Sequence, residues 1–298
     1  MSDTQKKKDW TLLELLEWTT NYLLEKNFDD ARLNTERLLA HTLGLSRVEL
    51  YTNFDRPLTS DELLQFKKIL KRRLAREPLQ YIVGETEFYS LPVTVRPGVL
   101  IPRPETEILV EQVINYCTDR FENDEEFHVL DMGTGSGCIA IAIKKNCPNV
   151  QVTAVDISED ALGIARENAE INNVNISLKN IDALKPWPAE YTSSFNVVVS
   201  NPPYVSFREF EQLQPEIQEF EPKISLLGGN DGLDFYRRIS NILTDLLKPN
   251  SAAFFEIGEK QSASVTNIFS EAGFENIQTI KDFAGKDRVI KMNWNRSS

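Results

Sequence analysis

Phe195-Asn-Val-Val-Val-Ser-Asn-Pro-Pro-Tyr204 is a short apolar run that ends in four residues of distinct chemistry. Its three consecutive valines are typical of a strand buried on both faces, as in the centre of a parallel sheet. The two prolines that follow cannot donate to a β-ladder, so the strand is expected to end beside Asn201. In open α/β sheets, ligands bind just beyond the carboxyl ends of the strands. The stretch therefore predicts an α/β sheet with Asn201 and Tyr204 at its ligand-binding edge.

Asn201 and Pro202 together offer two hydrogen-bond acceptors. The Asn201 side chain carries a carbonyl oxygen and an NH₂ group. The backbone carbonyl of Pro202 lies nearby, and Pro203 has no N–H to compete for it. Two acceptors held side by side suit a substrate group with two N–H hydrogens, such as a primary amide or an exocyclic amine, and Tyr204 adds a flat face for a planar group. Asn-Pro is also a common start of a turn, and these residues alone leave that alternative open.

A glycine-rich loop lies upstream of this stretch. Residues 127–132 are expected to form a strand that leads directly into the loop and then into an apolar helix over 138–145. Glycines let the backbone turn tightly and approach a ligand at a helix N-terminus. The loop has the spacing G-x-G-x-G and follows Asp131, and such a loop alone is weak evidence because dinucleotide enzymes also use glycine loops. The candidate cofactor-binding residues are Gly133, Thr134, Gly135, Ser136 and Gly137.

Two acidic residues end the next predicted strands. Asp156 follows the strand 150–155 and lies 23 positions past Gly133, close to the distance at which an acidic group binds a ribose hydroxyl pair. The strand 176–181 ends at Asp182, which is placed to contact an adenine amine or to lie in a solvated loop. The chain has no P-loop Gly-Lys-Ser/Thr. Together these features indicate a nucleoside-bearing cofactor rather than a nucleoside triphosphate.

Charge and composition exclude several classes of protein. The 298 residues carry a net charge of −12, and residues 1–90 hold 14 basic and 15 acidic side chains, so the remainder carries −11. Phosphate-backbone binding relies on clustered Lys and Arg, so we expect no direct nucleic-acid partner. No apolar run is long enough for a membrane span, and the first ten residues lack a signal-peptide core. Three cysteines and two histidines without metal or redox spacing predict a cytoplasmic protein with no metal site.

The chain is expected to divide into three segments. Residues 1–78 read as a small helical domain, which ends in a basic run from Lys67 to Arg76 that is either a solvated helix face or, less favoured, a docking patch. Residues 79–100, including the strand-like Tyr81–Val83, suggest a β-hairpin connector. From 101 to 298, strands and helices alternate, which predicts a parallel sheet with helices on both faces.

The motifs in combination resemble a known family. The glycine loop, Asp156 and Asn201-Pro-Pro-Tyr204 resemble class I S-adenosylmethionine-dependent methyltransferases that act on amide or amine nitrogen. Further motifs are similar to those of the peptide chain release factor glutamine methyltransferases, and they lie at residues 78–84, 100–107, 221–222 with 228–237, 256–258 and 284–289. The resemblance implies a Rossmann-like, seven-stranded, mostly parallel sheet with a reversed last hairpin. It also implies S-adenosylmethionine as cofactor, class 1 release factors as partners, and methylation of the N5 nitrogen of their Gly-Gly-Gln glutamine.

The resemblance also implies residue roles. Gly133 to Gly137 would line the cofactor, together with Asp182, Ala183 and Asn201, and Asp156 would hold the ribose. The glutamine would bind Asn201, Pro202, Pro203 and Tyr204, with Asn201 and Pro202 acting on the reacting nitrogen. Ala183 departs from some relatives, which carry an aromatic residue there. The alternatives are a ribosomal-protein glutamine methyltransferase, an adenine-N6 DNA methyltransferase, and a binding module without catalysis.

Overall fold

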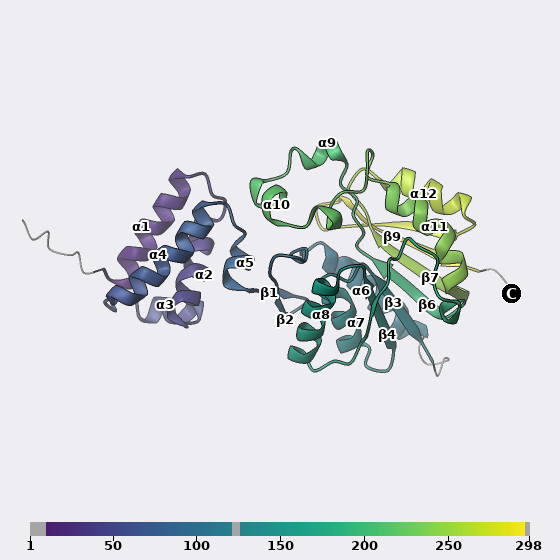
Figure 1. Cartoon of the computed structure of the whole chain (residues 1–298), viewed down its shortest axis with the longest axis horizontal. Coiled ribbons are helices and arrows are strands. Elements are labelled where there is room, and N and C mark those ends of the chain that lie inside the picture. Colours follow the sequence, from purple (N-terminus) through teal and green to yellow (C-terminus); the bar gives the residue numbers. More distant parts are fainter. Residues whose placement is uncertain (1–9, 121–125, 296–298) are drawn as a thin grey trace, which may run out of the picture. The chain divides into compact units, whose positions relative to one another are not determined.

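The computed structural model of this chain describes residues 10–120 and 126–295, in two units whose boundary lies between Gly84 and Glu85. The first unit is helical (Figure 1). Thr11, Ser46 and Thr59 each form a capping box with the glutamate three residues later, which defines where α1, α3 and α4 begin. Its helices are α1 (Leu12–Glu25), α2 (Ala31–Leu43), α3 (Arg47–Thr52), α4 (Ser60–Leu74) and α5 (Leu79–Val83).

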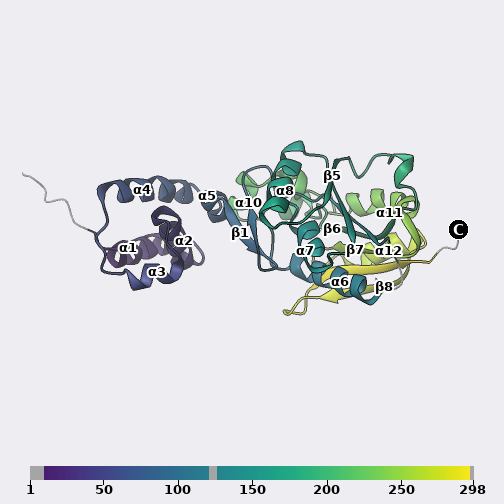
Figure 2. The same ribbon diagram turned by 90° about the horizontal axis from the view of Figure 1, so that it is seen from below.

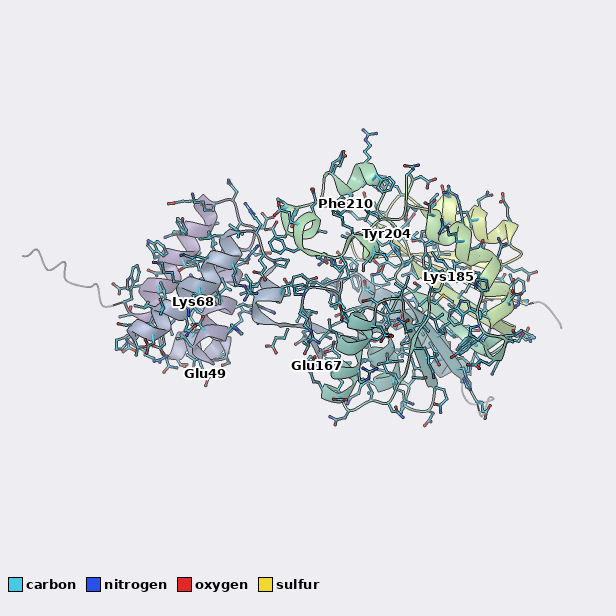
Figure 3. The ribbon with its side chains drawn as sticks, in the orientation of Figure 1. Glu49, Lys68, Glu167, Lys185, Tyr204 and Phe210 are labelled. Atoms are coloured by element: carbon cyan, nitrogen blue, oxygen red, sulfur yellow. The ribbon has the colours of Figure 1, made fainter. Side chains whose placement is uncertain are left out.

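The basic run on α4 divides into two kinds of residue. Arg73 is buried, and its guanidinium donates to Asn34 Oδ1 at 2.7 Å and lies over the Phe28 ring. Arg76 also stacks on Phe28, so these two arginines serve the fold of the unit, whereas Arg72 is exposed and forms an ion pair with Glu77. The three lysines are exposed at the surface: Lys67, Lys68 (labelled in Figure 3) and Lys71.

The segment that joins helices and sheet is only partly a hairpin. β1 (Glu85–Phe88) and β2 (Leu91–Thr94) pair antiparallel, and both residues between them have positive φ, as a tight two-residue turn requires. The expected strand at Tyr81–Val83 is wrong, because these residues belong to helix α5. Pro78 starts that helix and Gly84, at φ +88°, ends it, while its apolar side chains join the core of the first unit.

The second unit contains a seven-stranded sheet in the order β5-β4-β3-β6-β7-β9-β8 (Figures 1 and 2). Its strands are β3 (His128–Met132), β4 (Gln151–Asp156), β5 (Ser177–Asn180), β6 (Phe195–Ser200), β7 (Leu247–Glu256), β8 (Glu275–Lys281) and β9 (Asp287–Trp294). All neighbours from β5 to β7 are parallel, whereas β9 is antiparallel to both β7 and β8. The expected α/β fold with a seven-stranded, mostly parallel sheet is confirmed, and within the terminal hairpin β9 is the strand that reverses.

Helices cover both faces of this sheet. Leu130 of β3 and Val198 of β6 belong to one apolar cluster with Tyr236 of α11. Side chains of opposite parity point to the other face, where Phe254 of β7 meets the Tyr116 ring of α6 at 5.5 Å. The helices of this unit are α6 (Thr106–Arg120), α7 (Cys138–Asn146), α8 (Glu159–Ile171), α9 (Phe207–Phe210), α10 (Pro215–Phe220), α11 (Asp234–Leu246) and α12 (Ser262–Glu271).

The described residues contain neither a membrane-spanning helix nor a cluster of metal ligands. None of the helices described here has the length and apolar character needed to cross a membrane. Within residues 10–120 and 126–295, no three His, Cys, Asp or Glu side chains gather in a way that could hold a metal ion.

Candidate active site

The carboxyl ends of the central strands lie side by side. Met132 at the end of β3 pairs with Val155 and with Ser200, and Ser200 pairs with Phe255 of β7. The residues that follow, Asp156, Asn201 and Glu256, therefore emerge at the same edge as the glycine loop. The chain proceeds from β3 outward through β4 and β5 and then returns to β6 on the other side of β3, so this edge has the switch point at which open α/β sheets bind ligands.

The glycine loop has one open side. Gly133 and Gly135 have φ of +70° and +55°, and a Cβ built on either would meet no atom within 4 Å. The space beside this backbone is thus large enough for a ligand to approach closely. Gly137 differs, because its Cβ would lie 3.0 Å from that of Ala165 on α8. The third glycine therefore serves the packing of α7 against α8.

Buried polar groups support the loop from below. Thr134 Oγ1 donates to Asp131 Oδ2 at 2.6 Å, and the carbonyl of Ser136 accepts from Asn168 at 2.9 Å. Asp131 is fully buried, and desolvation raises the pKa of its carboxyl to about 7. Among the described residues, Asp131 Oδ1 has no hydrogen-bond partner. Asp131 therefore supports the loop from inside the protein through its hydrogen bond with Thr134.

Asp156 is held by the backbone around it. Its Oδ2 accepts from the N–H of Gly135 and its Oδ1 from that of Ser158, both at 2.9 Å. Each carboxylate oxygen can accept a second bond, and Asp156 is only half-buried, so two hydroxyls can still reach it. The next residue, Ile157, is 52% exposed, which places an apolar side chain at the surface directly beside this carboxylate.

Asp182 and Ala183 lie just beyond β5, on the same side of the sheet. Asp182 Oδ1 accepts from the N–H of Leu184 at 3.1 Å, and its Oδ2 lies 3.3 Å from Lys185 Nζ. The carbonyl of Ala183 accepts from Trp187 Nε1 at 3.1 Å, and the indole packs edge-on to Tyr191. Trp187 therefore packs within its own loop and against the core of the sheet rather than standing free beside Ala183.

Asn201 is oriented by a hydrogen bond from its amide nitrogen. Nδ2 donates to Thr106 Oγ1 at 3.1 Å, at the first residue of α6. No described residue donates to Asn201 Oδ1 or to the carbonyl of Pro202. Both acceptors expected from the sequence thus lack a donor among residues 10–120 and 126–295.

Glu256 links Asn201 to Tyr204. This carboxylate at the end of β7 is 2% exposed, and it accepts from Thr106 Oγ1 at 2.6 Å and from the Tyr204 hydroxyl at 3.1 Å. Desolvation raises the pKa of Glu256 to about 7, and burial also raises the pKa of Tyr204. The ring of Tyr204, labelled in Figure 3, is thereby fixed by its hydroxyl at one end.

A tight loop supports Pro203 and Tyr204 from behind. A Cβ on Gly228 would lie 2.6 Å from the carbonyl oxygen of Pro203, and one on Gly232 would lie 2.2 Å from that of Tyr204. The Tyr204 carbonyl also accepts from Gln261 Nε2 at 2.9 Å. These contacts hold the tetrapeptide backbone in one conformation, in contrast to the open carbonyl of Pro202.

The sequence analysis gave no role to three residues of this edge, Thr106, Ile157 and Glu256, although segments 100–107 and 256–258 belong to the motifs of the resemblance. Thr106 lies in the segment 101–107. The acidic residues around it are explained by their favourable interaction with the helix dipole, so the pattern gives no reason to single out the threonine. Glu256 is the one acidic residue in the otherwise apolar run Ala252–Ile257, and it lies close to the end of that run. An acidic residue at the carboxyl end of a buried strand was the signal that could have found it, as it found Asp156.

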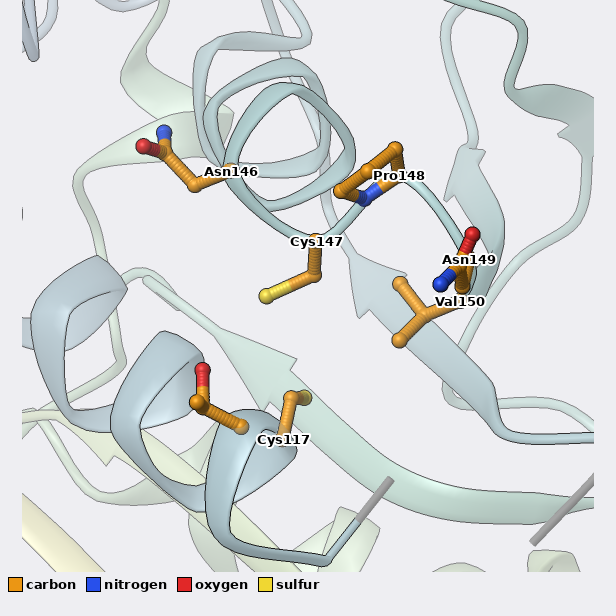
Figure 4. A pocket seen from close by; sticks show the side chains of 7 residues that line it. Cys117, Asn146, Cys147, Pro148, Asn149 and Val150 are labelled. Carbon is orange, nitrogen blue, oxygen red and sulfur yellow. The ribbon is translucent and has the colours of Figure 1, made fainter. Parts of the chain in front are cut away.

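One cavity lies away from this edge of the sheet, and a second adjoins it. The first is lined by residues that end α6 and α7 and precede β4, including Cys117, Cys147 and Val150 (Figure 4). It therefore sits toward the amino end of β4, opposite the glycine loop. A second pocket adjoins the candidate site, with Tyr204, Lys260 and Arg288 in its wall. Position at the carboxyl ends of the strands identifies the site better than the presence of a cavity does.

Comparisons with known proteins cover both units. The family model described as PrmC N-terminal domain matches residues 14–84, and that of the methyltransferase small domain matches residues 107–218. The release factor glutamine methyltransferase of Geobacter sulfurreducens is 42% identical over 287 residues, which cover 96% of this chain and 98% of that protein. The protein of the same name from Rhodopirellula baltica is 39% identical, with 98% and 99% covered.

A solved structure supports the fold. A methyltransferase from Pyrococcus furiosus superposes with a TM-score of 0.52 at 19% identity, covering 76% of this chain and 100% of that one. At this identity the similarity concerns the fold alone. The matches over nearly the whole chain carry the assignment: this chain belongs to the release factor glutamine methyltransferase family.

Proposed function

We propose that this protein transfers a methyl group from S-adenosylmethionine to the N5 side-chain nitrogen of the glutamine in the Gly-Gly-Gln motif of class 1 release factors. The observation that carries the proposal is the pair of open acceptors, Asn201 Oδ1 and the Pro202 carbonyl, at the carboxyl edge of the sheet. A primary amide has two N–H hydrogens, one for each acceptor. Family membership supports the release factor as the protein that brings this glutamine.

The cofactor half of the edge fits S-adenosylmethionine. The open space beside Gly133 and Gly135 admits a ligand against the backbone, and the remaining lone pairs of Asp156 can accept two ribose hydroxyls. Ile157 can pack against the adenine, which would supply the apolar contact that Ala183 is too small to make. Once bound, the cofactor supplies a methyl group on a positively charged sulfur. We therefore assign Gly133 to Gly137, Asp156, Ile157, Asp182 and Ala183 to its surroundings, with Asn201 at the boundary with the substrate.

The two acceptors position the glutamine nitrogen and stabilise the charge that develops on it. An amide nitrogen is a poor nucleophile because its lone pair is delocalised into the carbonyl. Hydrogen bonds from its two N–H groups to Asn201 and Pro202 hold the nitrogen in place and favour the positive charge that builds on it during transfer. Tyr204 offers its ring to the planar amide. Catalysis is then positioning and electrostatics without a covalent enzyme intermediate, and the product nitrogen sheds a proton to water.

Recognition of the whole release factor needs more than this pocket, since one glutamine does not distinguish a release factor from other proteins. We propose that the helical unit, which ends at Gly84 and includes α5, is the recognition domain, and that the second unit, from Glu85 on, carries out the transfer. Lys67, Lys68 and Lys71 are exposed positive charges of α4 that can contact the partner, whereas the exposed Arg72 is already paired with Glu77.

The test is transfer of labelled methyl from S-adenosylmethionine to a purified class 1 release factor. We expect label on the wild-type factor and none on a factor whose Gly-Gly-Gln glutamine is replaced by alanine, with mass spectrometry locating the label on the glutamine. Ribosomal proteins and an adenine-containing DNA duplex are assayed in parallel. Label that enters only one of these, or no substrate at all, would overturn the proposal in favour of another methyltransferase or a binding module.

A further inference from the structure

Glu256 is a buried carboxylate that binds neither partner of the proposed reaction directly. It follows Phe255 of β7, which pairs with Ser200 directly before Asn201. Both of its oxygens are occupied, one by the hydroxyl of Thr106 at 2.6 Å and the other by that of Tyr204 at 3.1 Å. An ionised carboxylate only accepts hydrogen bonds, so both hydroxyls must direct their protons toward it.

This arrangement decides which end of the Asn201 amide faces the crevice. A threonine hydroxyl has a single proton. Because Thr106 gives that proton to Glu256, its oxygen can only accept from Asn201, and the amide must present Nδ2 to it at 3.1 Å. Asn201 Oδ1 is then turned to the opposite side, where the substrate needs an acceptor. If the group at position 256 donated to Thr106 instead, the hydroxyl could turn its proton to Asn201 and stabilise the reversed amide.

We propose that Glu256 is a positioning residue that acts through Thr106 to keep the acceptor end of the Asn201 amide toward the substrate. The proposal rests on the proposed function, because it assigns the direction in which that site offers its acceptor. The same carboxylate holds the hydroxyl of Tyr204, so one buried charge orders both polar side chains of the tetrapeptide.

The charge of Glu256 is sensitive to pH near neutrality. Burial raises the pKa of its carboxyl to about 7, opposed by the hydrogen bonds from Thr106 and Tyr204. The titratable and charged groups that face it or its two partners are Tyr204, Tyr236, Glu105, Arg103, Arg288 and Cys138. A raised carboxyl pKa means that the ionised form, which the orientation requires, is populated as pH rises through 7. The turnover number should therefore rise over the same range.

The first experiment compares wild type with Glu256→Gln. Glutamine keeps the shape but carries a donor, so it cannot accept from both hydroxyls. Above pH 8 we expect kcat to fall about tenfold to hundredfold, less than the ~10²–10³ expected when one electrostatic partner is removed outright. Below pH 6 the two proteins should converge, because each then has a neutral group with a donor at position 256. Asp131 also has a raised pKa but titrates in both, so the ratio of the two kcat values isolates Glu256.

A ratio that does not change between pH 6 and 8 would overturn the proposal, as would an unchanged kcat at high pH. Titration with S-adenosylmethionine checks that the variant is folded, since the cofactor half does not depend on position 256. If wild type fails on release factors but methylates another N–H substrate, the proposed function is wrong, while the same ratio on that substrate still tests Glu256.

The second experiment removes the hydroxyl of Thr106, which links Glu256 to Asn201 by hydrogen bonds. Thr106→Val removes the hydroxyl and keeps the volume, so kcat should fall about tenfold or more, while Thr106→Ser, which retains the hydroxyl, should recover most of it. Thr118→Val is the matched control, an exposed threonine near the other end of α6 whose hydroxyl donates to the Ile114 carbonyl. Equal rates for the Val and Ser variants at position 106 would contradict a role for the hydroxyl.

The orientation of the Asn201 amide can also be measured directly, by nuclear magnetic resonance and without turnover. In protein labelled at asparagine nitrogen and threonine methyl groups, the Asn201 Nδ2 protons should show a nuclear Overhauser effect to the Thr106 methyl in wild type at pH 8. That contact should weaken in Glu256→Gln, because the amide is free to reverse. Its persistence at full strength in the variant would show that Glu256 does not set the orientation.

Discussion

The cofactor half and the substrate half of the carboxyl edge use different groups of the protein. The cofactor half uses backbone: positive-φ glycines and the N–H groups that hold Asp156, all within residues 133–158. The substrate half uses side chains from distant parts of the chain. Asn201 meets Thr106 across 95 positions, and Thr106 meets Glu256 across 150. The first half is a local motif, and the second exists only after the sheet has assembled.

The difference predicts how each half fails. Backbone donors are insensitive to side-chain chemistry, so the cofactor half should respond mainly to the loss of the Asp156 carboxylate or to a Cβ in its open space. The substrate half depends on a chain of hydrogen bonds with defined direction, so a single side chain or a single proton can disable it. Damage to one half should therefore leave the other working.

Replacing Asn201 by alanine is the strongest test of this separation. The substitution removes an acceptor that matters most as charge builds on the nitrogen, so kcat should fall by about 10²–10³. The affinity for S-adenosylmethionine, measured by calorimetric titration, should hardly change. Asn175→Ala, at an exposed position before β5, serves as control. A parallel loss of cofactor affinity would show that the two halves are not separate.

Asp156→Asn tests the opposite half. The change keeps the shape of the side chain but removes the charge, and charge-assisted hydrogen bonds are worth roughly 1.5–3 kcal/mol each. We expect the Kd for S-adenosylmethionine to rise about tenfold to hundredfold, with kcat at saturating cofactor nearly unchanged. Asp160→Asn, on the exposed first turn of α8, should leave Kd as it was. Unchanged affinity in Asp156→Asn would move the ribose site elsewhere.

Alanine substitutions at two glycines distinguish the space left for the cofactor from the space filled by helix packing. Alanine at either Gly135 or Gly137 costs about 1–2 kcal/mol of backbone strain, because φ is positive at both. The Gly135 Cβ enters open space, so its main effect should be on cofactor Kd. The Gly137 Cβ meets Ala165, so its main effect should be on the melting temperature. The reverse ranking in the two measurements would contradict the assignment of the open space to a ligand.

The smallest expected effect concerns substrate choice, which neither half explains. Changing Lys67, Lys68 and Lys71 together to glutamate should raise KM several-fold for an intact release factor, chiefly at low salt, because exposed charges act on association. The KM for a short Gly-Gly-Gln peptide should stay constant, since the peptide needs only the active site. Equal changes for both substrates would show that these lysines act on the fold rather than on recognition.

Local patterns were sufficient for much of this protein. The valine run before Asn201 predicted the central strand, and the strand-terminal acid at 156 predicted the residue beside the glycine loop. Tyr81–Val83 shows where local pattern fails: β-branched and aromatic residues favour a strand, yet Pro78 and Gly84 delimit a helical turn that packs into the helical unit. Intrinsic β-propensity is a weak preference that packing overrides.

The sequence by itself determined the parallel sheet, the glycine loop with Asp156, and the arrival of Asn201 at the ligand edge, because each depends on residues close together in the chain. Only the tertiary structure decided which end of the Asn201 amide is free. That choice depends on the proton of Thr106 and the charge of Glu256, which the pairing of β6 with β7 and the packing of α6 bring together. No pattern along the chain encodes the direction of a hydrogen bond between side chains so far apart in sequence.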